Sequence, residues 1–213
     1  MSDMDSHAWD LRYAEGELVW SAAANQFVAA ELSDISPGRA LDLATGEGRN
    51  ALWLADLGWE VTAVDFSVTG LDKARSLHTG HPRGRDLHID WVHADVLAYD
   101  AGPASYDLVL IAYLQLPADQ RRAVARRGFD ALAPDGTFFL VAHDSTNLTD
   151  GTGGPQDPAV LLTAEDVLSD LDGERFEVER AERVERIVEA SDEHRGEASR
   201  TAYDALVKLR KTG

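Results

Sequence analysis

The chain has 213 residues, of which 44% are apolar and 27% charged, a composition that indicates one sizeable core and excludes a fibre, a disordered tail or a disulfide-stapled miniprotein. It has no cysteine, which rules out disulfides, cysteine-ligated zinc, iron–sulfur clusters and a thiolate nucleophile. A formal net charge of −18 argues against nucleic acid as a partner, because this charge repels a phosphate backbone.

The chain offers no segment typical of a membrane span or a signal peptide. Its longest uninterrupted apolar run, residues 108–114, is far shorter than the roughly 20 residues that a transmembrane helix needs. The N-terminal segment MSDMDSHAWD is acidic, whereas a signal peptide begins with basic residues. We therefore expect a cytoplasmic protein without a membrane partner, in agreement with the absence of cysteine.

Strand-like and helix-like segments alternate between residues 40 and 143, the pattern of βαβ units and a mainly parallel sheet. The fourth predicted strand has the near-continuous hydrophobicity of a buried central strand. The predicted strands are Ala40–Ala44, Glu60–Asp65, Leu87–Asp95, Tyr106–Leu114 and Thr137–His143, and the predicted helices are Arg49–Leu57, Ser67–His78 and Pro117–Phe129. Four arginines of the last helix, Arg121, Arg122, Arg126 and Arg127, are interpreted as its solvated face.

Two flanking regions depart from this alternation. Residues 1–34 are predicted to form a helical cap, which is too short for a second domain. Residues 144–162 form a long loop rich in Gly, Pro and Asp, and loops of this length in compact domains are often functional, here as an active-site loop. A helix at Thr163–Leu171 and two antiparallel strands at Phe176–Val188 and Arg200–Leu209 complete a single predicted domain over residues 1–213.

The most informative segment is LDLATGEGRNA, residues 41–51, which reads as a strand, a glycine turn and a helix start. Gly46 and Gly48 allow the backbone to approach a ligand closely, and the helix start offers free N–H groups. Asp65 ends the next strand, where a carboxylate can accept hydrogen bonds from both hydroxyls of a ribose. The segment therefore implies a nucleoside-containing cofactor. The spacing of Gly46, Gly48 and Asp65 alone also suits a nicotinamide dinucleotide.

Asp42 favours a cofactor without phosphates. A buried carboxylate beneath the glycine turn would repel the pyrophosphate of a dinucleotide, whereas it suits a ligand that carries an ammonium group. S-adenosylmethionine carries an ammonium group and a sulfonium, and it has no phosphate. Asp95 ends the third predicted strand, where it can meet the adenine amino group while the backbone of Val96 reads the ring. Three carboxylates at the ends of adjacent strands thus predict one binding site.

Four segments, in this order and spacing, resemble the motifs of class I S-adenosylmethionine-dependent methyltransferases: residues 42–48, VDFS at 64–67, HADV at 93–96 and YDLVLIAYLQLP at 106–117. The resemblance implies an α/β, Rossmann-like fold with a seven-stranded, mainly parallel sheet, an antiparallel last strand and helices on both faces. Within the class, WDLRY, GEGRNALWLA and VDFS are most similar to small stand-alone bacterial enzymes of the tellurite-resistance and thiopurine methyltransferase kind.

The resemblance also implies that the cofactor contacts the glycine turn, the strand ends and the N-terminal cap. The implied contact residues are Asp42, Ala44, Gly46, Gly48, Asn50, Asp65, Phe66, Asp95, Val96, Ile111, Tyr13 and Trp20. Ala44 replaces the first glycine of the motif, which adds only a methyl group. Aromatic residues of the cap would suit a lid, because aromatic faces attract a sulfonium.

The acceptor of the methyl group is expected to be a small molecule, because the chain has neither a second domain nor a basic groove. Transfer from a sulfonium depends on alignment and on exclusion of water, so that a base is optional. Tyr113 and His143 follow the fourth and fifth strands, where substrates of parallel sheets bind, and they are the candidate catalytic residues. Further acceptor-side candidates are Gln115, Asp144, Asn147 and the pair His194 and Arg195.

Several alternatives stay open at this point. Tyr113 and His143 could serve packing alone, and a non-catalytic S-adenosylmethionine-binding module would keep the same motifs. A nicotinamide-dependent oxidoreductase also fits the glycine turn, but Asp42 and the lack of a Tyr-x-x-x-Lys pair argue against it. We expect no metal site, since His78 and His81 straddle a predicted helix end without a carboxylate partner.

Overall fold

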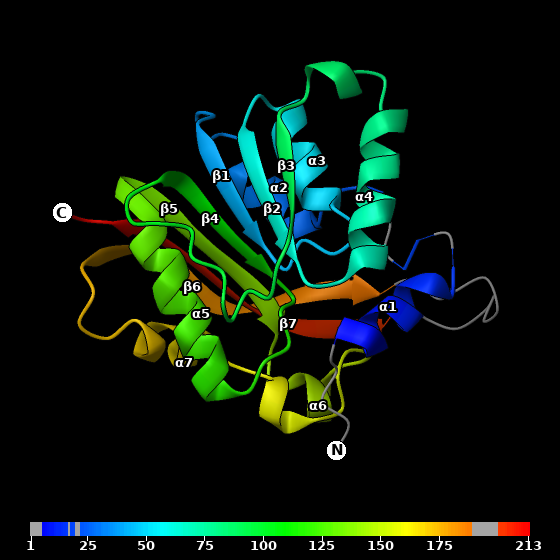
Figure 1. Cartoon of the computed structure of the whole chain (residues 1–213). Helices are drawn as coiled ribbons and strands as arrows, with labels where there is room; N and C mark the ends of the chain where they lie inside the picture. Colours follow the sequence, from blue (N-terminus) through cyan, green and yellow to red (C-terminus); the bar gives the residue numbers. More distant parts are fainter. Residues whose placement is uncertain (1–5, 17, 20–21, 189–199) are drawn as a thin grey trace.

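A computed structural model describes residues 6–16, 18–19, 22–188 and 200–213. At its centre lies a seven-stranded sheet in the order β3-β2-β1-β4-β5-β7-β6 (Figure 1). Strands β1 to β5 are parallel, and β7 is antiparallel to both β5 and β6, which confirms the predicted arrangement. The strands are β1 (Arg39–Leu43), β2 (Glu60–Asp65), β3 (Ile89–His93), β4 (Tyr106–Ala112), β5 (Leu132–His143), β6 (Phe176–Val188) and β7 (Arg200–Lys211).

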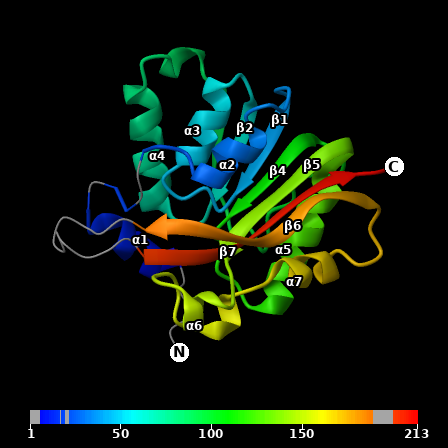
Figure 2. The same cartoon turned by 180° about the vertical axis from the view of Figure 1, so that it is seen from behind.

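Helices cover both faces of this sheet, as the view from behind in Figure 2 also shows. On one face lie α2 (Gln26–Leu32), α3 (Arg49–Asp56) and α4 (Val68–Gly80), and on the other lie α5 (Ala118–Ala131) and α7 (Ala164–Asp170). Strand residues alternate between the two cores. In β4, Leu108 packs with α3 and Val109 with α5, so both faces of this strand are buried, as its hydrophobic run predicts. Among the described residues, no helix is long and apolar enough to cross a membrane.

Local signals explain where several elements begin. The Ser67 side chain caps α4 by accepting a hydrogen bond from the backbone N–H of Gly70 at 3.0 Å. Thr163 and Asp166 form a reciprocal capping box at the start of α7. The predicted fifth strand is too short, because Leu132 already pairs with Tyr106 before the turn that precedes Thr137. Tertiary pairing, which the local sequence does not reveal, extends this strand.

The interpretation of the α5 arginines as a solvated face is wrong for Arg121. Its side chain is 9% exposed, and its Nε donates to Asp170 of α7 at 2.6 Å, while Asp170 itself is 1% exposed. Arg122 also reaches Asp170, at 3.1 Å, and Arg126 donates to the backbone carbonyl of Asp172. These arginines attach α7 to α5, so part of the basic cluster is neutralised within the chain.

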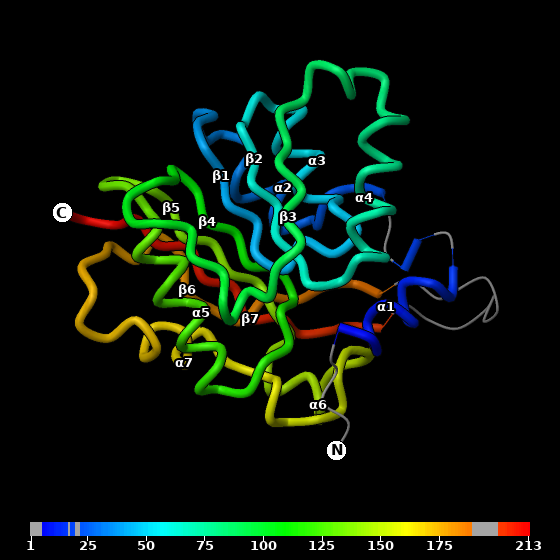
Figure 3. The backbone as a smooth tube through the Cα atoms, in the orientation of Figure 1, coloured from blue at the N-terminus to red at the C-terminus, as the bar shows by residue number. Residues whose placement is uncertain are grey.

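The parallel strands finish at the end of the molecule where α1 (Ser6–Ala14) and α6 (Asn147–Asp150) lie (Figures 1 and 2). The backbone trace in Figure 3 shows that the N-terminal region and the connection after β5 both pass this end of the sheet. The connection is tied down at several points: Asp144 bridges to Leu162, and the Asn147 side chain donates to the carbonyl of Gly153 at 2.8 Å. Residues 144–162 therefore form an anchored loop beside the strand ends.

Candidate active site at the carboxyl ends of the strands

The turn between β1 and α3 has a left-handed backbone at three positions, with φ of 62° at Ala44, 58° at Gly46 and 78° at Gly48. A Cβ atom at Gly46 would lie 2.6 Å from the Tyr13 hydroxyl, and one at Gly48 would lie 2.4 Å from the Trp91 ring. Both glycines thus make room for aromatic side chains of this chain, a packing role that no local sequence pattern reveals. Ala44 adopts a conformation that favours glycine, so its replacement of the motif glycine adds backbone strain as well as a methyl group.

Asp42 lies at the carboxyl end of β1 and is 1% exposed. Its Oδ2 accepts a hydrogen bond from the Thr45 hydroxyl at 2.7 Å, whereas its buried Oδ1 has no hydrogen-bond partner among the residues that the structure describes. Burial raises the pKa of Asp42 to about 7, against the opposing effect of the Thr45 hydrogen bond. A buried oxygen without a donor is costly, and an ammonium group would satisfy it.

Asp65, at the end of β2, is also buried, and its carboxylate holds the backbone around it. Its Oδ2 accepts from the N–H of Gly46 at 2.7 Å, and its Oδ1 accepts from the N–H of Ser67 at 2.8 Å. Burial raises the pKa of Asp65 despite these hydrogen bonds. Each carboxylate oxygen can accept a second hydrogen bond, so Asp65 retains capacity for a diol. Asp95 follows β3, and its Oδ1 accepts from the N–H of Leu97 at 2.8 Å.

Helix α1 docks over the same end of the sheet. Asp10 accepts hydrogen bonds from the Ser67 hydroxyl at 2.5 Å and from the N–H of Thr69 at 3.1 Å, which fixes α1 to the start of α4. Tyr13 is buried against the glycine turn. The Trp9 ring packs on the Tyr13 ring, with 5.5 Å between the ring centroids. Asp10 was not found from the sequence, because nothing local links it to residues more than fifty positions away. Trp20, the other predicted cap residue, lies outside the described residues.

The remaining predicted cofactor residues have contacts of their own. Asn50 is buried, and its Oδ1 accepts from the N–H of Asn25 at 2.9 Å, which joins α3 to the start of α2. The backbone carbonyl of Phe66 lies 3.0 Å from Nε2 of His93. Ile111 is buried in the core shared with α5, and Val96 packs at the edge of that core. Hydrogen bonds thus join Asp42 and Asp65 to the glycine turn, and Ile111 of β4 pairs with Leu43 of β1.

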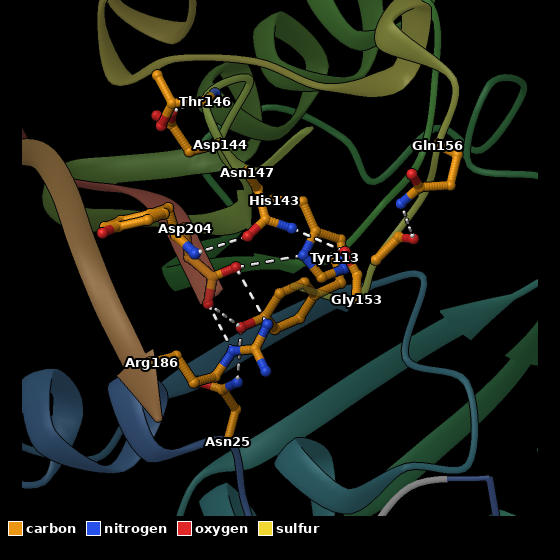
Figure 4. Close-up of polar contacts among 12 residues, drawn as sticks. Asn25, Tyr113, His143, Asp144, Thr146, Asn147, Gly153, Gln156, Arg186 and Asp204 are labelled. Atoms are coloured by element: carbon orange, nitrogen blue, oxygen red, sulfur yellow. Dashed lines mark hydrogen bonds and ion pairs between the residues drawn. The ribbon is translucent and has the colours of Figure 1, made fainter. Parts of the chain in front are cut away.

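A second group of polar side chains lies beyond the ends of β4 and β5 (Figure 4). The Tyr113 hydroxyl donates to Asp204 Oδ2 at 2.8 Å, and the Tyr113 and His143 rings lie 4.8 Å apart between centroids. Nδ1 of His143 lies 3.3 Å from Asp204 Oδ1, close enough for an ion pair but not aligned as a hydrogen bond. Tyr113 and His143, which are distant in the sequence, are therefore neighbours, as their places at strand ends predict.

Asp204 of β7 is fully buried and stands at the centre of this group. Arg186 of β6 donates to it from Nε at 2.7 Å and from Nη2 at 3.4 Å. Burial alone would raise the pKa of Asp204, but the contacts that His143 and Arg186 make with its carboxylate outweigh burial and hold this pKa below the usual range. Burial, and next the Asp204 charge, raise the pKa of Tyr113, so its hydroxyl stays protonated near neutral pH. Neither Asp204 nor Arg186 was found from the sequence, where they read only as alternating strand residues.

The other acceptor-side candidates have varied positions. Asp144 accepts from the N–H of Thr146 at 2.9 Å and starts the anchored loop. Asn147 is buried, and its Oδ1 accepts from the N–H of Tyr203 at 2.9 Å, so both residues hold the loop in place. Gln115 is half-buried in the turn after β4. The pair His194 and Arg195 lies outside the described residues.

A groove of about 740 Å³ lies at the opposite, amino-terminal ends of the strands, where its lining includes Thr62, Asp90 and Tyr106. It does not coincide with the residues described above. Ligands of open α/β sheets bind at the carboxyl ends of the strands, and the unpartnered carboxylate oxygen of Asp42 lies there. We therefore place the candidate site at the carboxyl ends.

The chain is similar to known methyltransferases. Residues 40–136 match the family described as "Methyltransferase domain". Thiocyanate methyltransferase 1 of Brassica oleracea is 24% identical over 170 residues, which cover 78% of this chain and 73% of the relative. The chain spans about half the length of several other curated methyltransferases that it matches.

Solved structures share the fold over most of the chain. The N-methyltransferase NodS of Bradyrhizobium japonicum, solved with S-adenosylhomocysteine, has a TM-score of 0.70 at 18% identity and covers 99% of this chain and 100% of its own. TehB from Haemophilus influenzae has a TM-score of 0.71 at 20% identity, over 90% of this chain and 64% of its own. At these identities the likeness shows the fold alone, and the family match adds that residues 40–136 resemble a methyltransferase domain. Residues 40–136 of this chain thus form a methyltransferase domain, and the fold of the whole chain is one that methyltransferases share.

Proposed function

We propose that the protein transfers a methyl group from S-adenosylmethionine, held at the ends of β1, β2 and β3, to a small molecule bound beyond β4 and β5. The unpartnered Oδ1 of buried Asp42 carries this proposal, because the cofactor's ammonium group provides the donor that this oxygen lacks. When bound, the cofactor supplies a methyl group on a positively charged sulfur. The chain's own residues have to hold it, orient the acceptor and exclude water.

Each part of the carboxyl end has a proposed task in holding the cofactor. Asp42 binds the ammonium group, Asp65 accepts from the ribose hydroxyls, and Asp95 with the backbone of Val96 meets the adenine. Tyr13 of α1 closes over the glycine turn, where it is already buried against Gly46. The remaining residues of the predicted set, Ala44, Gly46, Gly48, Asn50, Phe66, Ile111 and Trp20, are proposed to shape the walls of the same site.

The acceptor side is proposed to be formed by Tyr113, His143 and the loop over residues 144–162. Gly154 of this loop lies so close to His143 that a Cβ atom there would be 2.9 Å from Nδ1. The loop therefore packs directly on the imidazole and limits its contact with water. An anchored loop over a candidate acceptor residue favours an enzyme over a module that only binds the cofactor.

Isothermal calorimetry with S-adenosylmethionine, S-adenosylhomocysteine and NAD tests the proposed cofactor, and a mass-spectrometric screen for transferred methyl groups tests the reaction. We expect both adenosyl ligands to bind at micromolar concentration, NAD to give no heat, and methylation within a panel of thiols, phenols, amines, halides, thiocyanate and tellurium oxyanions. Binding of NAD alone would overturn the cofactor assignment. Binding of the adenosyl ligands without any transfer across that panel would favour the binding module.

A further inference from the structure

We infer that Asp204, together with Arg186, holds His143 in the tautomer with its proton on Nδ1, so that Nε2 is the atom that takes a proton from the methyl acceptor. The inference rests on the proposed function and goes beyond it by naming two positioning residues and an acceptor class. These three residues lie close together, although β5, β6 and β7 contribute them separately (Figure 4).

The geometry leaves Asp204 one oxygen for His143. Asp204 Oδ2 already accepts from the Tyr113 hydroxyl at 2.8 Å and from Arg186 Nε at 2.7 Å. Asp204 Oδ1 has only the longer contact from Arg186 Nη2, at 3.4 Å, and faces Nδ1 of His143 at 3.3 Å. An ionised carboxylate only accepts hydrogen bonds, so the nitrogen that faces it gains by carrying a proton.

Arg186 keeps Asp204 in the ionised form that this arrangement requires. Its guanidinium donates to both carboxylate oxygens, and such charge-assisted hydrogen bonds are strong in a buried site. Asp204 has no exposed surface, so solvent does not replace these partners. Loss of Arg186 would therefore weaken the ionised state of Asp204, whereas loss of Asp204 would remove the acceptor for His143 directly.

Nε2, the other ring nitrogen, makes no hydrogen bond with any residue in the described part of the chain, and the His143 side chain is 11% exposed. Tyr113 cannot replace it as a base near neutral pH, because burial and Asp204 raise the pKa of the phenol. Nε2 of His143 is thus the atom that the Tyr113, His143 and Asp204 group offers as a base to a bound acceptor.

The proton balance of the transfer then indicates the acceptor class. A neutral acceptor X–H gives its proton to His143 Nε2, a new X–CH₃ bond forms, and the sulfur–methyl bond breaks with its electron pair left on sulfur as S-adenosylhomocysteine. His143 becomes an imidazolium stabilised by Asp204, as a buried carboxylate stabilises a general-base histidine. The arrangement fits thiols, selenols, phenols and other acceptors that lose a proton, and it has no task for a halide or another anion without one.

Long-range ¹H–¹⁵N NMR of the imidazole rings tests this inference without an acceptor. The His143 signals are assigned by their loss in the His143→Gln variant and are recorded at a pH where the ring is neutral. We expect the proton on Nδ1, whereas a free neutral histidine in water favours Nε2. A proton on Nε2 in the unmodified protein would overturn the inference without any variant.

Two variants then separate positioning from general structure. Asp204→Asn is nearly isosteric, and we expect it to shift His143 at least partly to the Nε2 tautomer, while Arg186→Gln keeps the carboxylate and retains mostly the Nδ1 tautomer. An unchanged tautomer in Asp204→Asn would overturn the role of Asp204. Calorimetry on the same samples measures the affinity for S-adenosylhomocysteine separately. A failure of the cofactor assignment is therefore distinguishable from a failure of the tautomer assignment.

Discussion

The two halves of the candidate site are built in different ways. The cofactor half comes from one contiguous segment, the turn between β1 and α3, with Asp65 from the neighbouring strand and α1 packed on top. The acceptor half combines Asn25, Tyr113, His143, Arg186 and Asp204, which no local pattern connects. The difference teaches that backbone-based binding of the cofactor leaves a motif in the sequence, whereas an acceptor pocket made of side chains from separate strands does not.

Removal of the Asp204 carboxylate should have the largest effect on the free energy of unfolding, because the side chains of the acceptor half share this partner. Asp204→Ala leaves Arg186 and the Tyr113 hydroxyl without their shared partner. We expect the free energy of unfolding to fall by about 2–3 kcal/mol, less than for a fully buried pair because Arg186 is 24% exposed. Urea denaturation followed by circular dichroism measures the change.

Asp150→Ala is the matched control, because Asp150 also faces an arginine of β6, at 4.0 Å from Arg183, but both side chains are exposed. This variant should change the free energy of unfolding by less than about 0.5 kcal/mol. Equal effects of the two substitutions would show that Asp204 is not the structural centre of the acceptor half.

The corresponding substitution in the cofactor half is Asp42→Asn. The amide keeps the hydrogen bond from Thr45 but has no charge for an ammonium group, so S-adenosylmethionine should bind about 1.5–3 kcal/mol more weakly, roughly a 10- to 150-fold loss of affinity. Calorimetry at pH 8 measures it. Asp95→Asn should weaken binding less, because this residue is exposed to solvent. An Asp42→Asn protein with full affinity would remove Asp42 from the site.

The raised pKa of Asp42 makes the cofactor half sensitive to pH. With a pKa of about 7, Asp42 is increasingly protonated below that pH, and the neutral form does not attract an ammonium group. Affinity for S-adenosylhomocysteine should therefore fall by up to about tenfold per pH unit below pH 7 and level off above it. Calorimetry from pH 5.5 to 8.5 tests this, and the Asp42→Asn protein should lack the dependence.

The same shift predicts the opposite trend for the stability of the free protein. The pKa of Asp42 in the native state lies above its unfolded value of 3.8. Between pH 3.8 and about 7, Asp42 is therefore more protonated in the native state than in the unfolded state. The contribution of Asp42 is fully present below pH 3.8 and is lost as pH rises through about 7. The free energy of unfolding of the unmodified protein should therefore decline relative to that of Asp42→Asn between pH 5 and pH 8. A rising difference would contradict the sign of the shift.

The smallest expected effect concerns the glycine turn itself. Ala44 has φ of 62°, where glycine avoids the clash of Cβ with the backbone, so Ala44→Gly should raise the free energy of unfolding by about 0.5 kcal/mol after the greater freedom of unfolded glycine is subtracted. Ala51→Gly, in the regular part of α3, should lower it by about 1 kcal/mol or more. Destabilisation by both substitutions would show that Ala44 carries no strain.

The seven-stranded sheet with its antiparallel last strand followed from the family resemblance. Sequence periodicity and turn chemistry were sufficient for the alternation of strands and helices over residues 40–143, since burial on both faces of β4 and the Ser67 cap of α4 are local signals. They were also sufficient to place Asp42, Asp65, Tyr113 and His143 at strand ends. They could not show that Arg121 is buried against Asp170, or that Asp204 joins Tyr113 to His143. These contacts depend on helix docking and on the register of β5 against β7, which pairs His143 with Asp204.

A crystal structure of the protein with S-adenosylhomocysteine tests the central claim most directly. We expect the ligand at the carboxyl ends of β1, β2 and β3, with its ammonium group hydrogen-bonded to Oδ1 of Asp42 and its ribose hydroxyls to Asp65. A ligand in the groove at the amino-terminal strand ends, or one whose ammonium group lies away from Asp42 with Oδ1 still unpartnered, would contradict it.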